Sequence, residues 1–320
     1  LFIGNASARN VIIRSTITAS TANGAFQGAM RIGQSTSTWL LDCYVYGSTA
    51  VAVIGSSDTV IGGSLLVSTG THAAGLHANA SVNVDVASSI VRGLVGLGVS
   101  ITNAMGLNRL STNTISGTYA GVLVGTGTSA TQVWVTSNTI LPGSKTGSHT
   151  KGLVFDSLMG GATAQDNNIY YRTMGVPTGL GGSVAAFEGH TMAGVVFERN
   201  RINVPGALDG PNHNNFTAVN LRNVNAASIF FNDVQSSVTA INGTAFLVRL
   251  SEISNNIKLR NNVFSSSFSA TKRLQRSVAS SRFICTSGFP MKIAFLFLLS
   301  YWTSSATTCT GTGFSALGLA

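Results

Sequence analysis

Apolar and polar positions along the chain follow one recurring eight-residue motif, with apolar residues at its third and eighth positions and often Asn at its sixth. Its clearest copies are VWVTSNTI (133–140), VVFERNRI (195–202), ASIFFNDV (227–234) and IKLRNNVF (257–264), and weaker copies occupy 10–17, 38–45, 59–66, 83–90, 108–115 and 162–169. The copies end at Ile17, Val45, Leu66, Ile90, Ile115, Ile140, Ile169, Ile202, Val234 and Phe264, on average about 27 residues apart. This regular spacing predicts a repeat architecture of about ten units.

A second motif, small–apolar–any–apolar, falls between these copies. It reads AMRI (29–32), AVAV (50–53), GLHA (75–78), GVSI (98–101), GVLV (121–124), GLVF (152–155), AVNL (218–221) and AFLV (245–248), with VAAF (184–187) as a looser copy. Each repeat therefore contains at least two short strands of period two, separated by turns rich in Gly, Ser, Thr and Asn.

Such short strands cannot fold alone, because each buries only two apolar side chains. Stacked about 4.8 Å from an equivalent strand, each completes its backbone hydrogen bonds and shares one hydrophobic core. Equivalent Asn side chains would then lie one above another and hydrogen-bond along the axis as a ladder. The candidates for this ladder are Asn113, Asn138, Asn167, Asn200, Asn232 and Asn262. The pattern predicts an all-β solenoid, a right-handed, single-stranded parallel β-helix of about ten turns.

Other repeat folds fit the pattern less well. Leucine-rich repeats need a dense Leu pattern that the chain lacks, and propeller blades need about 40 residues each. A helical solenoid would not tolerate this much Gly and β-branched sequence. The composition agrees with a sheet-rich solenoid, since 9% of residues are charged against roughly 25% in ordinary soluble domains.

The N-x-[IV] copies, such as Asn138–Ile140, and the G-V-x-V copies, such as Gly121–Val124, resemble the pectin-lyase-like superfamily of right-handed parallel β-helix repeat proteins. The resemblance covers residues 10–264 and implies a carbohydrate context. That superfamily includes polysaccharide lyases, glycoside hydrolases, phage tailspikes and adhesins. Polygalacturonases carry clustered aspartates, Gly-His-Gly and Arg-Ile-Lys. This chain has Gly189-His190-Thr191 and Arg201-Ile202-Asn203 instead, so their catalytic roles are not carried over.

Repeat length indicates where a ligand would bind. The repeats that end at Ile115 and Ile140 are compact, at 25 residues, whereas those that end at Ile169, Ile202, Val234 and Phe264 have 29 to 33. Additional residues in a solenoid become loops on one face, which is often the binding face. We therefore expect a lateral groove beside turns seven to nine.

Charged residues gather in the same region. The weak candidates for catalysis are Asp166, Glu198, Arg199, Arg201 and Asp233, and in the expected register Asp166 stacks beside Arg199 and Arg201 beside Asp233. A patch of this kind could bind sugar, hold Ca²⁺ through its carboxylates, or use an Arg to withdraw a proton or neutralise a uronate. The simpler interpretation is a set of surface ion pairs worth about 0–1 kcal/mol each.

The weaker candidates for substrate binding are Tyr170, Glu188, His190 and His213. We expect Glu188, His190 and His213 on neighbouring loops. Of Tyr170 and Tyr171, one should pack inward and the other lie on the surface. No metal-ligand spacing is present, so we expect no metal site and no cofactor, with Ca²⁺ entering only under a lyase mechanism.

Net charge limits the choice of partner. Residues 1–265 hold 14 Lys and Arg and all 10 acidic residues, whereas 266–320 hold five basic residues and no acid. The body has no basic stripe with interleaved aromatics, which argues against nucleic-acid binding. Cys43 should be a small buried hydrophobe. Because the chain begins within repeat-like sequence, we interpret it as a fragment of a longer extracellular or cell-surface protein.

The repeat stops after Phe264, which divides the chain into a β-helix (1–265) and a tail (266–320). The tail is basic and Ser-rich, and its apolar run 293–302 is shorter than the roughly 20 residues of a membrane span. It is a hydrophobic cap, an anchoring or processing signal, or out-of-frame sequence. Membrane contact follows only if the run is native, and we expect 266–290 to be poorly ordered.

Three functions fit these observations. The first is an extracellular β-helix scaffold or adhesin-like module that contacts glycans. The second is a polysaccharide lyase or glycoside hydrolase acting in the lateral groove. The third is a tailspike-like fibre, which would require a trimer. The scarcity of carboxylates and the lack of a recognisable catalytic cluster favour the first.

Overall fold

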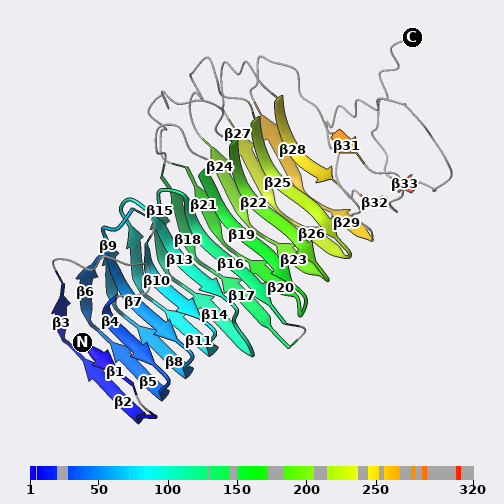
Figure 1. The fold of residues 1–320 in the computed structure, drawn as a ribbon. Coiled ribbons are helices and arrows are strands. Elements are labelled where there is room, and N and C mark those ends of the chain that lie inside the picture. The colour runs from blue at the N-terminus through cyan, green and yellow to red at the C-terminus, as the bar shows by residue number, and fades with distance from the viewer. Residues whose placement is uncertain are drawn as a thin grey trace.

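The computed structural model describes residues 1–4, 6–19, 28–71, 73–128, 130–143, 150–171, 183–204, 215–236, 244–251, 256–266, 275–277, 283–286 and 308–310. Over these ranges the chain winds into a solenoid of three parallel sheets, which we call A, B and C (Figure 1). Strands three places apart in the chain are neighbours in every sheet, apart from β33, which pairs with β32. This is the right-handed parallel β-helix expected from the repeats.

Each turn contributes one strand to each sheet. Sheet A consists of β1 (Phe2–Ile3), β4 (Gly28–Gly33), β7 (Thr49–Ile54), β10 (Ala74–Asn79), β13 (Leu97–Thr102), β16 (Ala120–Gly127), β19 (Thr150–Leu158), β22 (Ser183–Met192), β25 (Asn215–Val224), β28 (Thr244–Ser251) and β31 (Gln275–Ser277). Sheet B consists of β2 (Ala8–Ile13), β5 (Thr36–Leu41), β8 (Ser57–Gly62), β11 (Val82–Ala87), β14 (Leu107–Ser111), β17 (Gln132–Thr136), β20 (Ala162–Gln165), β23 (Val195–Glu198), β26 (Ala227–Phe230), β29 (Ile257–Arg260), β32 (Phe283–Thr286) and β33 (Thr308–Thr310). Sheet C consists of β3 (Thr16–Thr18), β6 (Tyr44–Gly47), β9 (Leu65–Ser68), β12 (Ile90–Gly93), β15 (Thr114–Gly117), β18 (Thr139–Pro142), β21 (Asn168–Tyr170), β24 (Arg201–Val204), β27 (Asp233–Ser236) and β30 (Val263–Ser266).

The eight-residue motif spans a corner of the solenoid. In the copy 133–140, β17 ends at Thr136 and β18 begins at Thr139. Between them Ser137 takes a left-handed backbone conformation with φ of 56°, and Asn138 follows it. Left-handed residues turn the chain sharply, and Asn, Asp and Gly adopt this conformation most readily. The motif is therefore two strands of different sheets joined by a two-residue corner, which gives three strands to a turn.

The inward side chains of sheet C form the predicted hydrophobic column. Ile115, Ile140, Ile169 and Ile202 are in register on adjacent strands, and all are fully buried. One position was predicted wrongly, because Ile90 is 38% exposed and Val91 takes its place between the neighbouring turns. The corner before β12 ends at Ser89, one residue later than the motif implied, and a shift of one residue reverses the face on which a side chain lies.

Aromatic side chains fill the core in the wider turns. The Phe187 ring stacks on the Phe197 ring with centroids 4.4 Å apart, and it meets the Phe155 ring edge-on at 5.7 Å. All three rings are fully buried. The small Ala164 lies in register with Phe197, so that large and small residues alternate along this part of the column.

A column of hydrogen bonds runs along the corner between sheets B and C. The backbone N–H of each corner residue donates to the side-chain oxygen of the equivalent residue one turn later, from Asn113 to Asn138 at 2.9 Å through to Asn232 and Asn262 at 2.9 Å. The predicted Asn ladder is confirmed for all six residues, Asn113, Asn138, Asn167, Asn200, Asn232 and Asn262. It continues toward the N-terminus through smaller side chains at Ser89, Ser64 and Cys43. Cys43 is buried as expected and its thiol is free.

Strand pairing extends past the last clear copy of the motif. β31 pairs with β28, β32 with β29, and β33 with β32. The division of the chain at residue 265 stays a prediction, and the apolar run 293–302 lies outside the described residues. Across the ranges that the structure describes, no helix is long and apolar enough to cross a membrane.

Candidate functional site

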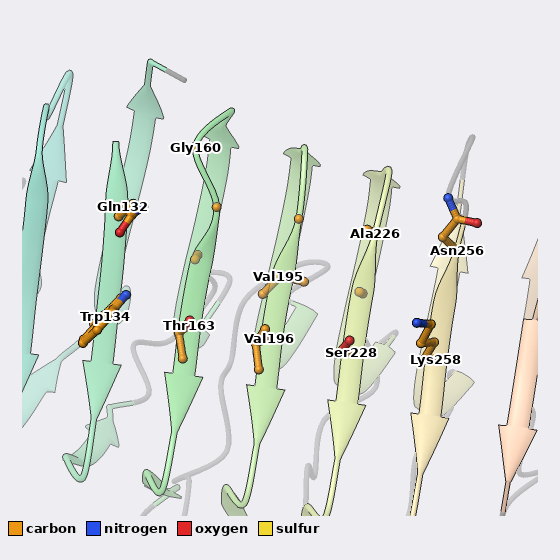
Figure 2. A pocket seen from close by; sticks show the side chains of 14 residues that line it. Gln132, Trp134, Gly160, Thr163, Val195, Val196, Ala226, Ser228, Asn256 and Lys258 are labelled. Atoms are coloured by element: carbon orange, nitrogen blue, oxygen red, sulfur yellow. The ribbon is translucent and has the colours of Figure 1, made fainter. Parts of the chain in front are cut away.

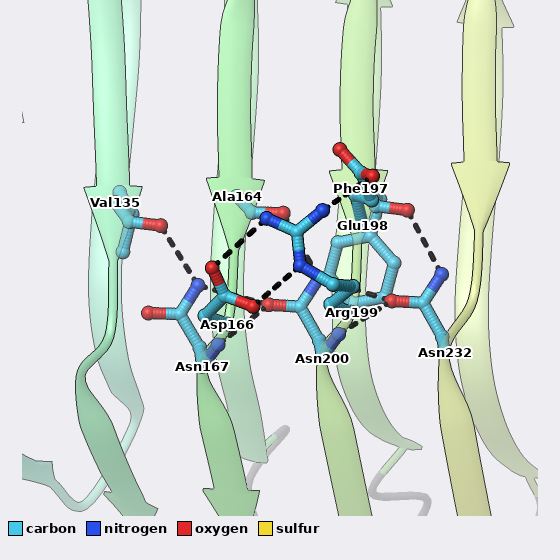
Figure 3. Close-up of polar contacts among 9 residues, drawn as sticks. All are labelled: Val135, Ala164, Asp166, Asn167, Phe197, Glu198, Arg199, Asn200 and Asn232. Atoms are coloured by element: carbon cyan, nitrogen blue, oxygen red, sulfur yellow. Dashed lines mark hydrogen bonds and ion pairs between the residues drawn. The ribbon is translucent and has the colours of Figure 1, made fainter.

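Asp166 and Arg199 meet at the corner between sheets B and C, as the repeat register predicted. Both take left-handed backbone conformations, with φ of 56° and 50°. The Arg199 guanidinium donates to both carboxylate oxygens of Asp166, from Nε at 2.8 Å and from Nη2 at 3.1 Å, and its Nη1 donates to Oε1 of Glu198 at 2.6 Å (Figure 3). The three side chains lie directly outside the ladder residues Asn167 and Asn200.

This corner group faces solvent. The exposed fractions of the side chains are 44% for Arg199, 42% for Asp166 and 24% for Glu198. The hydrogen bonds to Asp166 raise the pKa of Arg199 above its usual value, and the Asp166 and Glu198 charges act in the same direction. Arg199 therefore stays protonated and cannot act as a base.

Arg201 and Asp233 form a separate, looser pair on the outer face of sheet C. They lie in register on β24 and β27, and Arg201 Nε is 3.9 Å from Asp233 Oδ2. Asp233 also accepts a hydrogen bond of 2.9 Å from Gln235 Nε2. The side chains are 60% and 38% exposed, which is the geometry of a weak surface ion pair. The prediction from the repeats that Arg201 stacks beside Asp233 is confirmed.

Glu188 and His190 lie on strand β22, and the expectation that they belong to loops is wrong. Both point outward from sheet A, because Phe187 on the same strand is inward and fully buried and side chains alternate along a strand. Their surroundings are unusually polar. His190 Nδ1 is 2.9 Å from Asp156 Oδ1, and Lys151 forms an ion pair with Glu188.

The third strand of this surface adds an amide and a guanidinium. Asn220 on β25 is in register with Glu188 and donates to its Oε1 at 3.5 Å. Arg222 is in register with His190. We call this set the sheet A cluster; it comprises Lys151, Asp156, Glu188, His190, Asn220 and Arg222. Of its two carboxylate pairs, Glu188 with Lys151 is the more enclosed, at 20% and 30% exposed, whereas His190 and Asp156 are 35% and 44% exposed.

The sequence motifs missed four members of the cluster. Val154 aligns with Glu188, and Glu188 with Asn220. The strand copy in β22 is therefore Ala186–Gly189, two residues after the looser copy VAAF (184–187). With this alignment, Asp156, His190 and Arg222 occupy one position directly after the motif. The presence of polar residues at that position on three consecutive turns is the sequence feature that would have predicted the cluster.

The two tyrosines behave as expected. Tyr171 is fully buried and its hydroxyl donates to the Ala185 carbonyl oxygen at 2.6 Å. Burial raises the pKa of Tyr171 well above its ordinary range, which suits a structural role. Tyr170 is 36% exposed. His213 lies outside the described residues.

A recess of about 430 Å³ lies on the outer face of sheet B from β17 to β29 (Figure 2). It covers the seventh to ninth turns, beside which the groove was expected, and reaches one turn beyond them at each end. The residues that line it include Trp134, Thr163, Gly194, Ser228 and Lys258. No group of three or more His, Cys, Asp and Glu in the described ranges is arranged to hold a metal ion.

Comparison with known proteins finds likeness at the level of structure. No protein-family model matches the chain, and no curated protein matches it in sequence. It is similar to DFA-IIIase from Arthrobacter chlorophenolicus A6 without its lid, at 9% identity and a TM-score of 0.45, covering 81% of this chain and 66% of that one. A mutant of DFA-IIIase in complex with DFA-III gives 10% identity, a TM-score of 0.46 and coverages of 81% and 67%.

The Dettilon tailspike protein gives 13% identity and a TM-score of 0.31, with coverages of 81% and 59%. The chain thus spans between about half and two thirds of the length of these proteins. The assignment of the fold comes from the three parallel sheets of the chain itself.

Proposed function

We propose that the chain is an extracellular β-helix module that binds a glycan on the sheet A cluster. The observation that carries the proposal is the gathering of two carboxylates, an imidazole, an ammonium and an amide on the outer face of three consecutive strands. On the preceding strands of that face, the positions in register with Glu188 hold Arg31, Ala52, His77, Ser100, Leu123 and Val154, with no carboxylate among them. The carboxylates in the described strands of sheet A therefore lie at β19 and β22.

The cluster has the hydrogen-bonding capacity that a polyhydroxyl ligand needs. Carboxylates accept strong charge-assisted hydrogen bonds from hydroxyl groups, and ammonium and amide groups donate them. Asn220 Oδ1 is a buried acceptor to which no residue in the described part of the chain donates. An unpaired buried acceptor costs about 1–3 kcal/mol, and a ligand hydroxyl that reached it would remove that penalty.

The cluster is also held rigidly. Lys151 and Asn220 contact Glu188, and Asp156 orients His190, so these side chains lose little freedom when a ligand binds. Beneath them Phe155 and Phe187 are packed in the core. Sites on strands with packed support keep their geometry better than sites on loops.

The low charge content supports a place outside the cell or on its surface. The chain combines 9% charged residues with a surface of short Gly, Ser, Thr and Asn side chains. Rigid solenoids of this kind present long binding surfaces at a fixed spacing. This assignment is tested by locating the native protein in fractionated cells and medium, where recovery in the soluble interior would overturn it.

Binding is tested by titrating the whole chain with a panel of neutral and acidic polysaccharides in a calorimeter. We expect Glu188→Gln and His190→Gln each to weaken binding by about tenfold, since each removes a charge-assisted hydrogen bond. Asp233→Asn is the matched control, because it neutralises a carboxylate on sheet C and leaves sheet A intact. Unchanged affinity in both sheet A variants, or no binding to any polysaccharide, contradicts the proposal.

One observation favours a second function, cleavage of the glycan. A His oriented by a carboxylate, as in the pair His190 and Asp156, is an arrangement that enzymes use for proton transfer. In a lyase, His190 Nε2 would take the proton from a sugar carbon, a C=C bond would form to the neighbouring carbon as its C–O bond breaks, and the leaving oxygen would take a proton from water. Incubation with acidic and neutral polysaccharides, with and without Ca²⁺, followed by assays for reducing ends and ultraviolet-absorbing unsaturated ends, separates the two functions. Products that disappear in His190→Gln would establish the enzyme.

A further inference from the structure

The recess on sheet B has a regular construction. Its lower row consists of Trp134, Thr163, Val196, Ser228 and Lys258, which lie in register on five consecutive strands (Figure 2). The row above contains Gln132 and Asn256 at its two ends and Gly161, Gly194 and Ala226 between them. Side chains are thus missing or minimal in the middle of the upper row, and the surface is hollowed there. We call this feature the sheet B trough.

The connections between sheets A and B explain the shape. Two residues, Ala193–Gly194 and Asn225–Ala226, join the strands in the middle of the trough. The connection before β20 has three residues, 159–161. The trough therefore lies along a run of short corners between sheets A and B, and no long insertion is needed to form it.

The chemistry of the trough limits what can bind there. Strands β17, β20, β23, β26 and β29 are all paired on both sides, so their backbone groups are already used within the sheet. An extended peptide that adds to a sheet edge therefore has no edge to pair with. A ligand in the trough must be held by side chains, and these offer hydroxyl groups at Thr163 and Ser228 and amides at Gln132 and Asn256.

Trp134 supplies an aromatic surface at one end. Its side chain is 45% exposed, and the Arg109 guanidinium covers one face of the ring with its Cζ 5.5 Å from the centroid. A cation on one face stabilises the ring position and leaves the other face for a ligand. The C–H groups of a sugar ring carry partial positive charge and pack well on the negative face of an indole.

The trough is also basic. Lys258 closes the end opposite Trp134, and none of the 14 lining residues is acidic. Arg109 lies beside Trp134 outside the lining, where it also pairs with Asp85 at 4.0 Å. Four strand spacings separate Trp134 from Lys258, which corresponds to about 19 Å at ~4.8 Å each. That length suits a short run of sugar residues laid along the solenoid axis.

We propose that the sheet B trough binds a linear acidic oligosaccharide, with one sugar ring stacked on Trp134 and a carboxylate or sulfate group paired with Lys258. The hydroxyl and amide side chains between these two anchors hold the intervening sugars. The trough lies on a different sheet from the sheet A cluster. This site therefore goes beyond the proposed function, and either can fail without the other.

The test uses tryptophan fluorescence and calorimetry on the whole chain. The probes are tetramannuronate, tetragalacturonate and a chondroitin sulfate tetrasaccharide, with cellotetraose as the uncharged comparison. We expect at least one acidic probe to change the fluorescence and to bind about tenfold more tightly than cellotetraose. Trp134→Ala should abolish the fluorescence change, Trp134→Phe should keep part of the affinity, and Lys258→Gln should remove the preference for the acidic probe.

Trp39→Ala is the matched control. Trp39 lies in the same outer row of sheet B and is 48% exposed, but it stands outside the trough, so its loss should leave affinity unchanged. The inference is wrong if no acidic probe binds, or if Trp134→Ala and Trp39→Ala behave alike. It is also wrong if sedimentation shows a dimer that Trp134→Ala dissociates, because a second copy then fills the trough. Glu188→Gln should not alter the fluorescence response, which keeps the two sites distinguishable.

Discussion

Asn167 Nδ2 donates to Oδ1 of Asn200 at 2.9 Å, one turn further along the solenoid. The same Nδ2 donates to the Val135 carbonyl oxygen at 2.7 Å. In turn, the Asn167 Oδ1 accepts from both the backbone N–H and the Nδ2 of Asn138, at 3.0 and 3.1 Å. The amide is 2% exposed, and it connects three turns of the corner.

Asn167→Ala should therefore destabilise the fold by at least ~2 kcal/mol, because it takes the side-chain acceptor from the buried backbone N–H of Asn138 and the side-chain donors from the Val135 carbonyl and Asn200 Oδ1. Thermal unfolding followed by circular dichroism measures the effect. Asn168→Ala, which removes an exposed amide from the next position, is the control and should change the melting temperature little. Similar shifts in both variants would show that the ladder contributes nothing specific.

Arg199→Ala should have a much smaller effect than Asn167→Ala, although it removes three hydrogen bonds. The Arg199 pairs with Asp166 and Glu198 are exposed to solvent, where water and salt compensate for their loss. The difference in melting temperature between Arg199→Ala and the wild type should vanish in 1 M salt. A loss of stability as large as that of Asn167→Ala, persisting in salt, would require a structural role for this corner group.

Phe187→Ala should lower the free energy of unfolding by about 3–5 kcal/mol, the usual effect of removing a fully buried aromatic ring. Phe187 packs between Phe155 and Phe197, so its removal leaves both neighbours facing a cavity. Denaturant titration provides the measurement. Phe231→Ala is the control, since Phe231 is 50% exposed at the neighbouring corner. A small effect of Phe187→Ala would mean that the turn collapses around the gap.

His77 should make the stability depend on pH. Burial lowers the pKa of His77 below its ordinary value of 6.5. The unfolded chain therefore binds a proton at a higher pH than the folded chain does, and stability falls as the pH drops through 6.5 toward the folded pKa. Melting temperatures at pH 7.5 and pH 5 should differ less in His77→Gln than in the wild type. An identical difference in both proteins would exclude His77 as the cause.

Much of the fold follows from the sequence because one requirement repeats in every turn. A buried Asn amide at a corner needs hydrogen-bond partners, and the equivalent Asn one turn away supplies them. The regular spacing of the Asn residues from Asn113 to Asn262 therefore predicted the ladder. The same requirement placed Ile115 above Ile140. At Ile90 the prediction failed, because alternation in a four-residue strand is too short to correct an error of one residue at the preceding corner.

The candidate site was harder to predict than the fold. Glu188 and Lys151 are 37 residues apart in the chain, and only the register of sheet A brings them together. That register passes through connections of different length, and the motif copy in β22 was misaligned by two residues. Asp166 and Arg199 were placed correctly because the Asn ladder beside them fixed their alignment. Candidate site residues were placed correctly only where a buried, repeated residue such as the ladder Asn fixed the alignment of neighbouring turns.

The hydrogen bonds from backbone N–H to side-chain oxygen in the corner column all point one way. Every backbone N–H in the series from Cys43 to Asn232 depends on an oxygen supplied by the turn that follows it. Removing a turn from the C-terminal side of this series would strip a buried N–H of its acceptor. Removal from the N-terminal side would free that side-chain oxygen and would also take away the carbonyl to which the Asn Nδ2 donates, as Val135 does for Asn167. Trimming the solenoid at either end should therefore leave one donor of the corner column without its acceptor, a backbone N–H at the back and a side-chain N–H at the front.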